Sequence, residues 1–251
     1  MSHLTPPTDY IDAQTRYWQH YSDNLSQLRK AYALAQRFRL PQSGWTITTI
    51  TLSYRRASIS ADLSRIESGQ RPCFLCSHAR PEAQLSQPWG EYEILVNPYP
   101  LGEAHLTIPA VNHTPQLLSP SRVTDMLRLA SLLPSHAVFY NGPRSGASAP
   151  DHFHFQAVDR QLAANLLSTP LIHLEGNPGV SVSSADAPYG FLTIDSDTVT
   201  ETTERFFTLL SLLPQPDSDP EPPLNLYAIA IPGQAVPRLY VIPRRRHLTT
   251  F

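Results

Sequence analysis

The chain has 251 residues and a formal net charge of −2 at pH 7, with 19 Lys and Arg against 21 Asp and Glu. This near-neutral balance gives no support to a general role at nucleic acids or membrane surfaces. The length suits one large domain or two small ones, and no apolar stretch approaches the roughly 20 residues that span a bilayer.

The first residues, MSHLTPPTDY, lack the charged and then apolar pattern of a signal peptide. We therefore expect a cytoplasmic protein. In that compartment Cys73 and Cys76, the only cysteines, are not expected to form a structural disulfide.

The first elements predicted in chain order are helical. Residues 10–39 contain no Pro or Gly and carry a mixed apolar stripe, which predicts one or two helices ending at Leu40 and Pro41. Residues 45–54, WTITTITLSY, are β-branched and alternating, which predicts a strand. Residues 92–98 and 105–109 predict two more strands, joined by the turn-rich YPLGEA.

Residues 119–134 predict a helix that Ser119 or Ser121 caps and that ends before Pro134. Residues 159–200 give no clear pattern apart from their last few. The remaining predicted elements are strands at 137–141, 152–158, 224–231 and 238–243, a helix at 198–214, and loops at 142–150 and 215–223. This content predicts an α+β protein with a mostly antiparallel sheet and flanking helices.

Two short fragments recur. Ser-Leu-Leu-Pro occurs at 131–134 and 211–214, and Ile-Pro-x-x-x-His occurs at 108–113 and 242–247. Their order is opposite in the two halves, so they form no simple tandem repeat. Chance explains such short matches, and a degenerate duplication is the alternative.

The segment DHFHFQAV places His152, His154 and Gln156 at period two. On a strand these side chains share one face, while Phe153 and Phe155 occupy the other and can fill a core. A merely solvated polar face is one interpretation, and a polar cleft is the other. The preceding GPRSGASAP favours the cleft, because its backbone N–H groups and hydroxyls can bind phosphate oxygens.

The segment PCFLC places Cys73 and Cys76 in a C-x-x-C pair, a common half-site for tetrahedral zinc. A redox pair and two buried cysteines are the alternatives, although the strand-to-helix context of a thioredoxin-like motif is missing. Zinc requires two further ligands, which are expected to be histidines. The nearest candidates are His78, His105, His113 and His152.

These motifs resemble the histidine-triad (HIT-like) superfamily over about residues 70–158. YNGPRSGASAPDHFHFQ resembles the active-site run of its transferase branch, which includes galactose-1-phosphate uridylyltransferase, diadenosine tetraphosphate phosphorylase and GDP-galactose phosphorylase. That branch carries glutamine where hydrolases carry a third histidine, and Gln156 stands there. PCFLC resembles the zinc-binding pair of the uridylyltransferases, and NPYPLGEAHLTIPAVNHTPQLL resembles the segment with a metal-binding histidine.

The resemblance implies a structural zinc site of Cys73, Cys76, His113 and His152, with His113 preferred to His105. It makes His154 the nucleophile of a nucleotidyl-histidine intermediate, with Gln156 donating to a phosphoryl oxygen. The candidate substrate-binding residues are Asn141, Ser145, Gly146, Ala147, Ser148, Asp151 and Arg244.

Three of these assignments carry alternatives. GASAPDH is one residue longer than the Gly-Cys-Ser-Asn-Pro-His of the uridylyltransferases, so either Ser145 or Ser148 is the phosphate partner. Asp151 either orients a histidine or contacts a sugar hydroxyl. In the basic end PRRRHLTTF, Arg244 or Arg246 reaches a substrate phosphate, or the segment is a solvated tail.

The implied substrate is a nucleotide sugar or a dinucleoside polyphosphate, and the implied acceptor is phosphate or a sugar 1-phosphate. Relatives are often dimers, which is compatible with a homodimer here; no nucleic acid or membrane partner is expected. A nucleotide hydrolase and a zinc-stabilised nucleotide-binding module without turnover are the alternatives. The expected organisation is one HIT-like domain over residues 1–251, comprising a helical segment (1–40), a catalytic half (45–158) and a degenerate second half (159–251).

Overall fold

The computed structural model describes residues 7–55 and 72–244. The chain forms two compact units. The first unit contains residues 1–37, 48–116 and 147–158, and the second contains residues 38–47, 117–146 and 159–251. Within the described ranges, no helix is long and apolar enough to cross a membrane.

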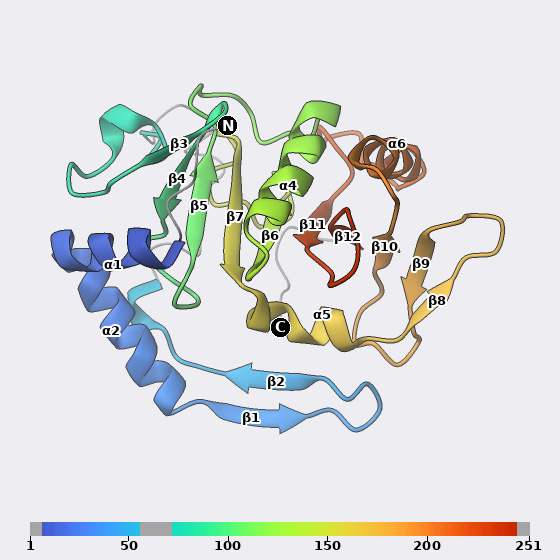
Figure 1. Ribbon diagram of the computed structural model, residues 1–251, viewed down its shortest axis with the longest axis horizontal. Coiled ribbons are helices and arrows are strands. Elements are labelled where there is room, and N and C mark those ends of the chain that lie inside the picture. Colours follow the sequence, from blue (N-terminus) through green and yellow to red (C-terminus); the bar gives the residue numbers. More distant parts are fainter. Residues whose placement is uncertain (1–6, 56–71, 245–251) are drawn as a thin grey trace. The chain divides into compact units, whose positions relative to one another are not determined.

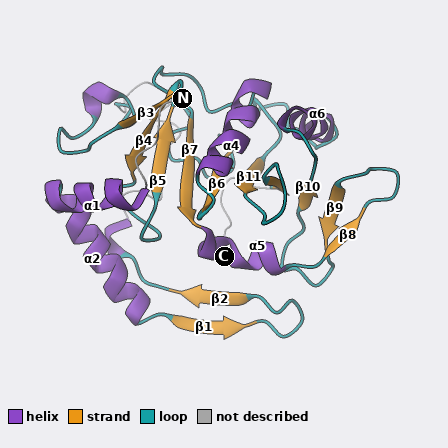
Figure 2. Ribbon diagram, in the orientation of Figure 1, coloured by secondary structure: helices purple, strands orange, loops and turns teal. Residues whose placement is uncertain are grey.

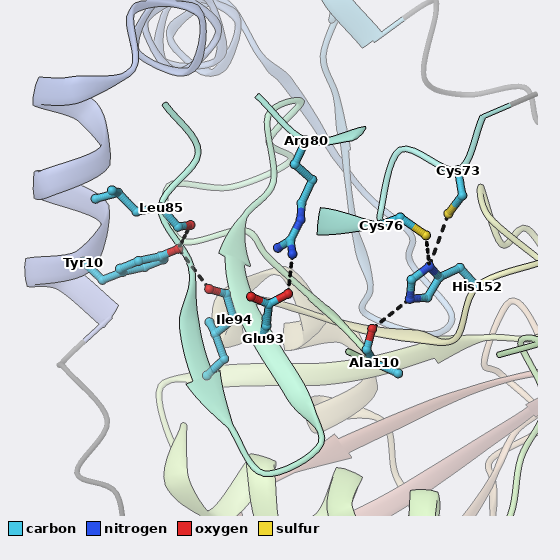
Figure 3. Close-up of polar contacts among 9 residues, drawn as sticks. All are labelled: Tyr10, Cys73, Cys76, Arg80, Leu85, Glu93, Ile94, Ala110 and His152. Atoms are coloured by element: carbon cyan, nitrogen blue, oxygen red, sulfur yellow. Dashed lines mark hydrogen bonds and ion pairs between the residues drawn. The ribbon is translucent and has the colours of Figure 1, made fainter. Parts of the chain in front are cut away.

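The first unit combines two helices with four antiparallel strands in the order β3-β4-β5-β7. The hydroxyl of Tyr10 donates to the carbonyl oxygens of Leu85 and Ile94, which fastens the first helix to the sheet (Figure 1, Figure 3). The elements are α1 (Pro7–Tyr17), α2 (Gln19–Ala33), β3 (Gln87–Trp89), β4 (Tyr92–Val96), β5 (Leu106–Pro109) and β7 (His154–Asp159), with short 3-10 turns at Ser53–Arg55 and Ser77–Ala79.

The helical prediction for residues 10–39 is correct up to Ala33 and wrong beyond it. The chain turns into β1 (Gln36–Arg39), which pairs with β2 (Thr46–Thr49) in a two-stranded hairpin. The Leu40 N–H donates to the Trp45 carbonyl at 2.8 Å across the turn, and Gly44 adopts a φ of 70°. Cross-strand pairing around this glycine turn therefore outweighs the local absence of helix breakers.

The second unit contains six antiparallel strands in the order β6-β11-β12-β10-β9-β8. Helix α4 packs on β6 and β11, and α6 packs on β10 (Figure 2). The elements are α4 (Pro120–Leu132), β6 (His136–Asn141), a 3-10 turn (Arg160–Ala163), α5 (Ala164–Ser168), β8 (Leu171–His173), β9 (Val180–Ser183), β10 (Leu192–Ile194), α6 (Val199–Leu210), β11 (Leu224–Ile229) and β12 (Arg238–Pro243).

The two longer helices of the second unit begin as their sequences predict. The Ser119 hydroxyl accepts the Arg122 N–H at 3.2 Å, and the Thr198 hydroxyl accepts the Glu201 N–H at 3.2 Å. Such N-caps satisfy backbone donors that have no partner within the helix. The α+β class and the antiparallel sheet are confirmed.

Strand β7 begins at His154, two residues later than predicted. His152 instead lies in a turn, where its N–H donates to the Ala149 carbonyl at 3.1 Å. The prediction that His152, His154 and Gln156 share one face of a strand is therefore correct for His154 and Gln156 and wrong for His152. Phe153 and Phe155 are fully buried, as their alternation predicts.

Candidate metal centre and active site

Two cysteines and two histidines from three segments of the first unit meet at one point. The ligand atoms of Cys73, Cys76, His113 and His152 all lie within 4.8 Å of one another. The sulfur of Cys73 is 3.2 Å from Nδ1 of His152, and that of Cys76 is 3.2 Å from Nδ1 of His113. Figure 3 shows both sulfurs facing the same edge of the His152 ring. This cluster could hold a metal ion such as zinc.

The local backbone explains how the cysteines come together. The Cys76 N–H donates to the Cys73 carbonyl at 3.3 Å, so the C-x-x-C forms a tight turn. Cys73 and Leu75 pack with Ala149 in a small buried cluster. Burial and the neighbouring Cys73 thiol raise the pKa of Cys76. A bound cation would reverse this effect, because a coordinating thiol is deprotonated.

The outer nitrogen of each histidine also has a defined neighbour. Nε2 of His152 lies 2.8 Å from the carbonyl oxygen of Ala110, so Nε2 carries the proton and Nδ1 presents its lone pair to the cysteines. Nε2 of His113 lies 3.9 Å from the Asp151 carboxylate. Asp151 thus lies near His113, as expected if its role is to orient a histidine, the first of its two alternatives. Such outer partners orient metal-binding histidines.

The donor set fits a metal ion on geometric grounds. In a tetrahedral site with zinc–sulfur and zinc–nitrogen distances of about 2.3 and 2.1 Å, sulfur and nitrogen ligands lie about 3.6 Å apart. The observed separations of 3.2 to 3.5 Å are close to that value. Four protein ligands would leave no open position, so the centre would be structural.

His154 is held by its backbone and by its ring. Gln116, which is fully buried, accepts the His154 N–H at 2.7 Å and donates to the His154 carbonyl at 3.0 Å. The Gln116 side chain thus pairs with the His154 backbone as a neighbouring strand would, at the point where Pro109 ends β5 opposite His154. The His154 ring is nearly buried, and its Nδ1 lies 2.9 Å from the His152 carbonyl oxygen.

These contacts fix the tautomer of His154. A carbonyl oxygen only accepts, so Nδ1 of His154 carries a proton and donates it to His152. Burial lowers the pKa of His154 to about 4, against the opposing effect of that hydrogen bond. The ring is therefore neutral near pH 7, and Nε2 carries a lone pair, as a nucleophile requires.

Gln156 follows on the same face of β7 and pairs with Thr107 of β5. Its Oε1 lies 2.9 Å from Nε2 of His105. Nδ1 of His105 accepts the Leu101 N–H at 3.1 Å. Both nitrogens of His105 are thus engaged away from the cysteines, which leaves His113 as the second histidine of the metal cluster.

In the second unit, Asn225 connects three of its neighbours. Its amide donates to Oδ1 of Asn141 at 2.7 Å and to the Ser145 carbonyl at 2.8 Å. Its Oδ1 accepts from Arg244 at 2.9 Å. Arg244 therefore belongs to an ordered network, whereas Arg246 lies outside the described residues.

The start of the predicted phosphate loop is tightly constrained. The Ser145 N–H donates to the Gly142 carbonyl at 2.8 Å. A Cβ on Gly142 would lie 2.9 Å from the Leu224 carbonyl oxygen, so only glycine fits without a shift. Gly146 has a φ of 96°. Within the described part of the chain, the buried Ser145 hydroxyl has no hydrogen-bond partner, while Ala147 is buried and Ser148 is partly exposed.

Three residues that organise these clusters could not be identified from the sequence. They are Gln116, Asn225 and His105, the last of which is the partner of Gln156. Gln116 and His105 lie 38 and 51 residues from their partners along the chain, and no local spacing reveals such pairings. The one available signal for Gln116 is its place in NHTPQLL, three residues after His113.

The described residues form an antiparallel α+β protein with a cluster of two cysteines and two histidines, one of which, His152, lies in the turn before β7. The chain belongs to the family described as "Domain of unknown function (DUF4922)", which matches residues 10–159. No curated protein matches the sequence.

Solved structures give distant matches. A yeast Ap4A phosphorylase, Apa2, is 15% identical with a TM-score of 0.53, over 91% of this chain and 81% of that one. The same yeast enzyme in complex with Ap4A has a TM-score of 0.50 at 15% identity, over 92% of this chain and 81% of that one. A uridylyltransferase mutant is 12% identical with a TM-score of 0.42, over 85% of this chain and 86% of that one. This chain therefore shares the fold of the yeast phosphorylase.

Proposed function

We propose that this protein is a nucleotidyltransferase or phosphorylase that works through a nucleotidyl-His154 intermediate. The observation that carries the proposal is the fixed tautomer of His154, whose Nδ1–H donates to the His152 carbonyl. Nε2 is then the only ring nitrogen with a lone pair to offer. The Gln116 clamp on the His154 backbone holds that nitrogen in place.

The reaction has two balanced steps. In the first, Nε2 of His154 forms a bond to the α-phosphorus of the substrate, while the bond to the departing phosphate oxygen breaks and the leaving group keeps its electron pair. In the second, an oxygen of the acceptor phosphate attacks the same phosphorus and the P–N bond breaks. The departing phosphate needs no proton, and the His152 carbonyl stabilises the positive charge that develops on the ring.

Gln156 would donate its amide to a non-bridging oxygen, where charge grows in the transition state. We assign Ser145, Gly146, Ala147 and Ser148 to phosphate binding. The buried Ser145 hydroxyl, without a partner among the described residues, supports its role there over that of Ser148. Asn141 and Arg244 are proposed to contact the substrate as well. Asp151 is better placed to orient His113 than to bind a sugar.

We propose zinc as the metal held by Cys73, Cys76, His113 and His152, because two thiolates and two imidazoles are its usual structural donors. Zinc bound there supplies no chemistry to the reaction. The four side chains would instead fix the turn that leads into β7. His152 would thereby hold the metal through Nδ1, while its carbonyl oxygen accepts from the ring of His154.

Two substrate classes fit this chemistry. A nucleotide sugar with phosphate or a sugar 1-phosphate as acceptor is the first, as the active-site motif implies. A dinucleoside polyphosphate is the second, favoured by the fold shared with a yeast Ap4A phosphorylase. Both present the same α-phosphorus to the same nucleophile.

The experiment is quenching of the metal-loaded protein in an alkaline denaturant, which preserves an acid-labile P–N bond, after incubation with nucleotides labelled at the α-phosphorus. UDP-, GDP- and ADP-sugars and Ap4A are each tested, with and without inorganic phosphate. We expect an acid-labile label on His154, and a nucleoside diphosphate product that requires phosphate. A nucleoside monophosphate formed equally without phosphate would identify a hydrolase. Binding without label or turnover would identify a nucleotide-binding module, and turnover by His154→Ala would refute the mechanism.

A further inference from the structure

The contact between His105 and Gln156 has a directional consequence. His105 is fully buried immediately before β5. A backbone N–H can only donate, so the Leu101 N–H fixes Nδ1 of His105 as an acceptor. Burial and the nearby charge of Arg55 lower the pKa of His105 to about 3, against the opposing hydrogen bond to Gln156. The ring is therefore neutral, and its single N–H is on Nε2.

That N–H points at Gln156. Nε2 of His105 lies 2.9 Å from Oε1 of Gln156, so the oxygen of the carboxamide accepts. The two polar ends of a carboxamide lie on opposite sides, so once the oxygen faces His105 the amino group faces away from it. Thr107, the cross-strand partner of Gln156, is itself fixed because its hydroxyl accepts from the Asn97 amide at 2.9 Å.

We infer that His105 is a positioning residue that fixes Gln156 as a hydrogen-bond donor toward the phosphoryl group. This inference rests on the proposed function, since it assigns a direction to the Gln156 amide in that reaction. With the amide reversed, Oε1 would face the phosphoryl oxygens and repel them. Because the Leu101 backbone sets the tautomer, the orientation exists before substrate binds and costs no reorganisation during the reaction.

Two substitutions at His105 separate its two hydrogen bonds. His105→Gln carries an amide nitrogen at the ε position and can still donate to Gln156. His105→Asn reaches only the δ position, so it can keep the Leu101 contact and lose the donor to Gln156. We expect nucleotidyl-enzyme formation to remain close to wild type in His105→Gln and to fall about 10- to 100-fold in His105→Asn. His136→Asn, which alters another buried histidine, is the matched control and should retain the wild-type rate.

A double-variant comparison tests whether His105 acts through Gln156. If it does, adding His105→Asn to Gln156→Ala should cause no further loss in the rate of labelling. Equal rates for His105→Asn and His105→Gln, or additive losses in the double variant, would overturn the inference while nucleotidyl transfer stood. If the wild type forms no nucleotidyl-enzyme with any donor, the proposed function itself fails.

A spectroscopic test needs no substrate. Long-range ¹H–¹⁵N correlation spectra of the metal-loaded wild-type protein at pH 7 should show His105 as the neutral Nε2–H tautomer. Gln156→Ala should shift the Nε2 resonance of His105, and His136→Asn should leave it in place. A protonated Nδ1 on His105 would refute the inference whatever the substrate.

Discussion

Two antiparallel strand pairs, one in each unit, have equivalent registers but carry different side chains. In the first unit β5 pairs with β7 so that Thr107 faces Gln156 and Ile108 faces Phe155. In the second unit β10 pairs with β12 so that Thr193 faces Tyr240 and Ile194 faces Leu239. The first strand of each pair begins with the same three residues, Leu-Thr-Ile, at 106–108 and 192–194.

The side chains differ at the positions proposed for catalysis. His105 and Gln156 form a hydrogen bond in the first pair. At the corresponding positions, Phe191 and Tyr240 form a ring contact with centroids 5.8 Å apart. Two residues further along each pair, His154 faces Pro109, whereas Arg238 forms an ion pair with Asp195 at 2.8 Å. The same strand pairing therefore carries two neutral histidines, His105 and His154, in the first unit. In the second unit it carries an aromatic contact and an ion pair.

The order of elements repeats as well. A hairpin (β4–β5), a helix (α4) and two strands (β6, β7) are followed by a hairpin (β9–β10), a helix (α6) and two strands (β11, β12). Ser-Leu-Leu-Pro lies at the C-terminal end of both helices, overlapping the last two residues of α4 and directly following α6. We therefore propose that residues 159–251 are a degenerate copy of the catalytic half. The Ile-Pro matches end β5 and β12, which are not counterparts, so that fragment gives no support; His247 lies outside the described residues.

The largest expected effect contrasts His154 with its counterpart Arg238. His154→Ala removes the nucleophile and should lower nucleotidyl transfer by about a thousandfold or more. Arg238→Ala removes an ion pair in the second unit and should leave covalent labelling intact. Quenched-flow labelling with the α-phosphorus-labelled donor measures both. Equal losses in the two variants would mean that the catalytic assignment of β7 is wrong.

The next effect concerns the metal centre. In the second unit, the residue that corresponds to His152 is Val236, which lies two residues before Arg238 as His152 does before His154. Val236 is buried, and its side chain cannot bind a metal. Chelation, or Cys73→Ser, should therefore lower stability by several kcal/mol through the first unit, because metal binding is coupled to folding. Hydrogen exchange should accelerate at the amides of β5 and β7 and stay slow at those of β10 and β12.

The control for the metal experiment is re-addition of one equivalent of zinc, which should restore protection of β7 in the wild type and not in Cys73→Ser. Metal analysis of the purified wild type should give about one zinc per chain, as four ligands for one closed site imply. Full protection of β7 in metal-free protein would contradict the scaffold role.

Sequence reasoning was strongest where the signal is local. The cap at Ser119 and the buried Phe153 and Phe155 follow from spacing within a few residues. The clamp from Gln116 was missed because it forms only when a distant loop lies against β7. The Leu-Thr-Ile repeat is too short to be significant until the pairing registers place it on equivalent strands.

His105 should make the free energy of unfolding depend on pH, whereas Phe191, at the corresponding position of the second unit, has no group that titrates. The pKa of His105 is lowered to about 3 in the folded protein, against about 6.5 in an unfolded chain. Between these values the unfolded state binds a proton that the folded state does not, so stability falls as pH falls. One such group contributes about 1.4 kcal/mol per pH unit. His105→Phe removes this contribution.

Urea unfolding of the metal-loaded protein at pH 6.5 and pH 5 measures the difference. His105→Phe should lose about 2 kcal/mol less than wild type over this interval, since 1.5 pH units at about 1.4 kcal/mol each are removed. The converse Phe191→His, at a buried position, should steepen the loss. Parallel curves for wild type and His105→Phe would show that His105 is not held neutral.

The smallest expected effect concerns the ion pair between Arg238 and Asp195, in which Arg238 occupies the position that corresponds to the proposed nucleophile, His154. The Arg238 guanidinium lies 2.8 and 3.0 Å from the two Asp195 oxygens, and both side chains are partly exposed. Because solvent screens such a pair, Asp195→Asn should lower the free energy of unfolding by only about 1 kcal/mol or less. Arg238→Lys should cost a similar amount, since Nε of Arg238 makes both contacts and the lysine ammonium lies one bond further from the backbone than that nitrogen. A double variant no worse than either single one would show that the pair acts as a unit. A loss of several kcal/mol would instead mean that the pair fixes β12 to β10 as firmly as the metal ligands fix the turn before β7.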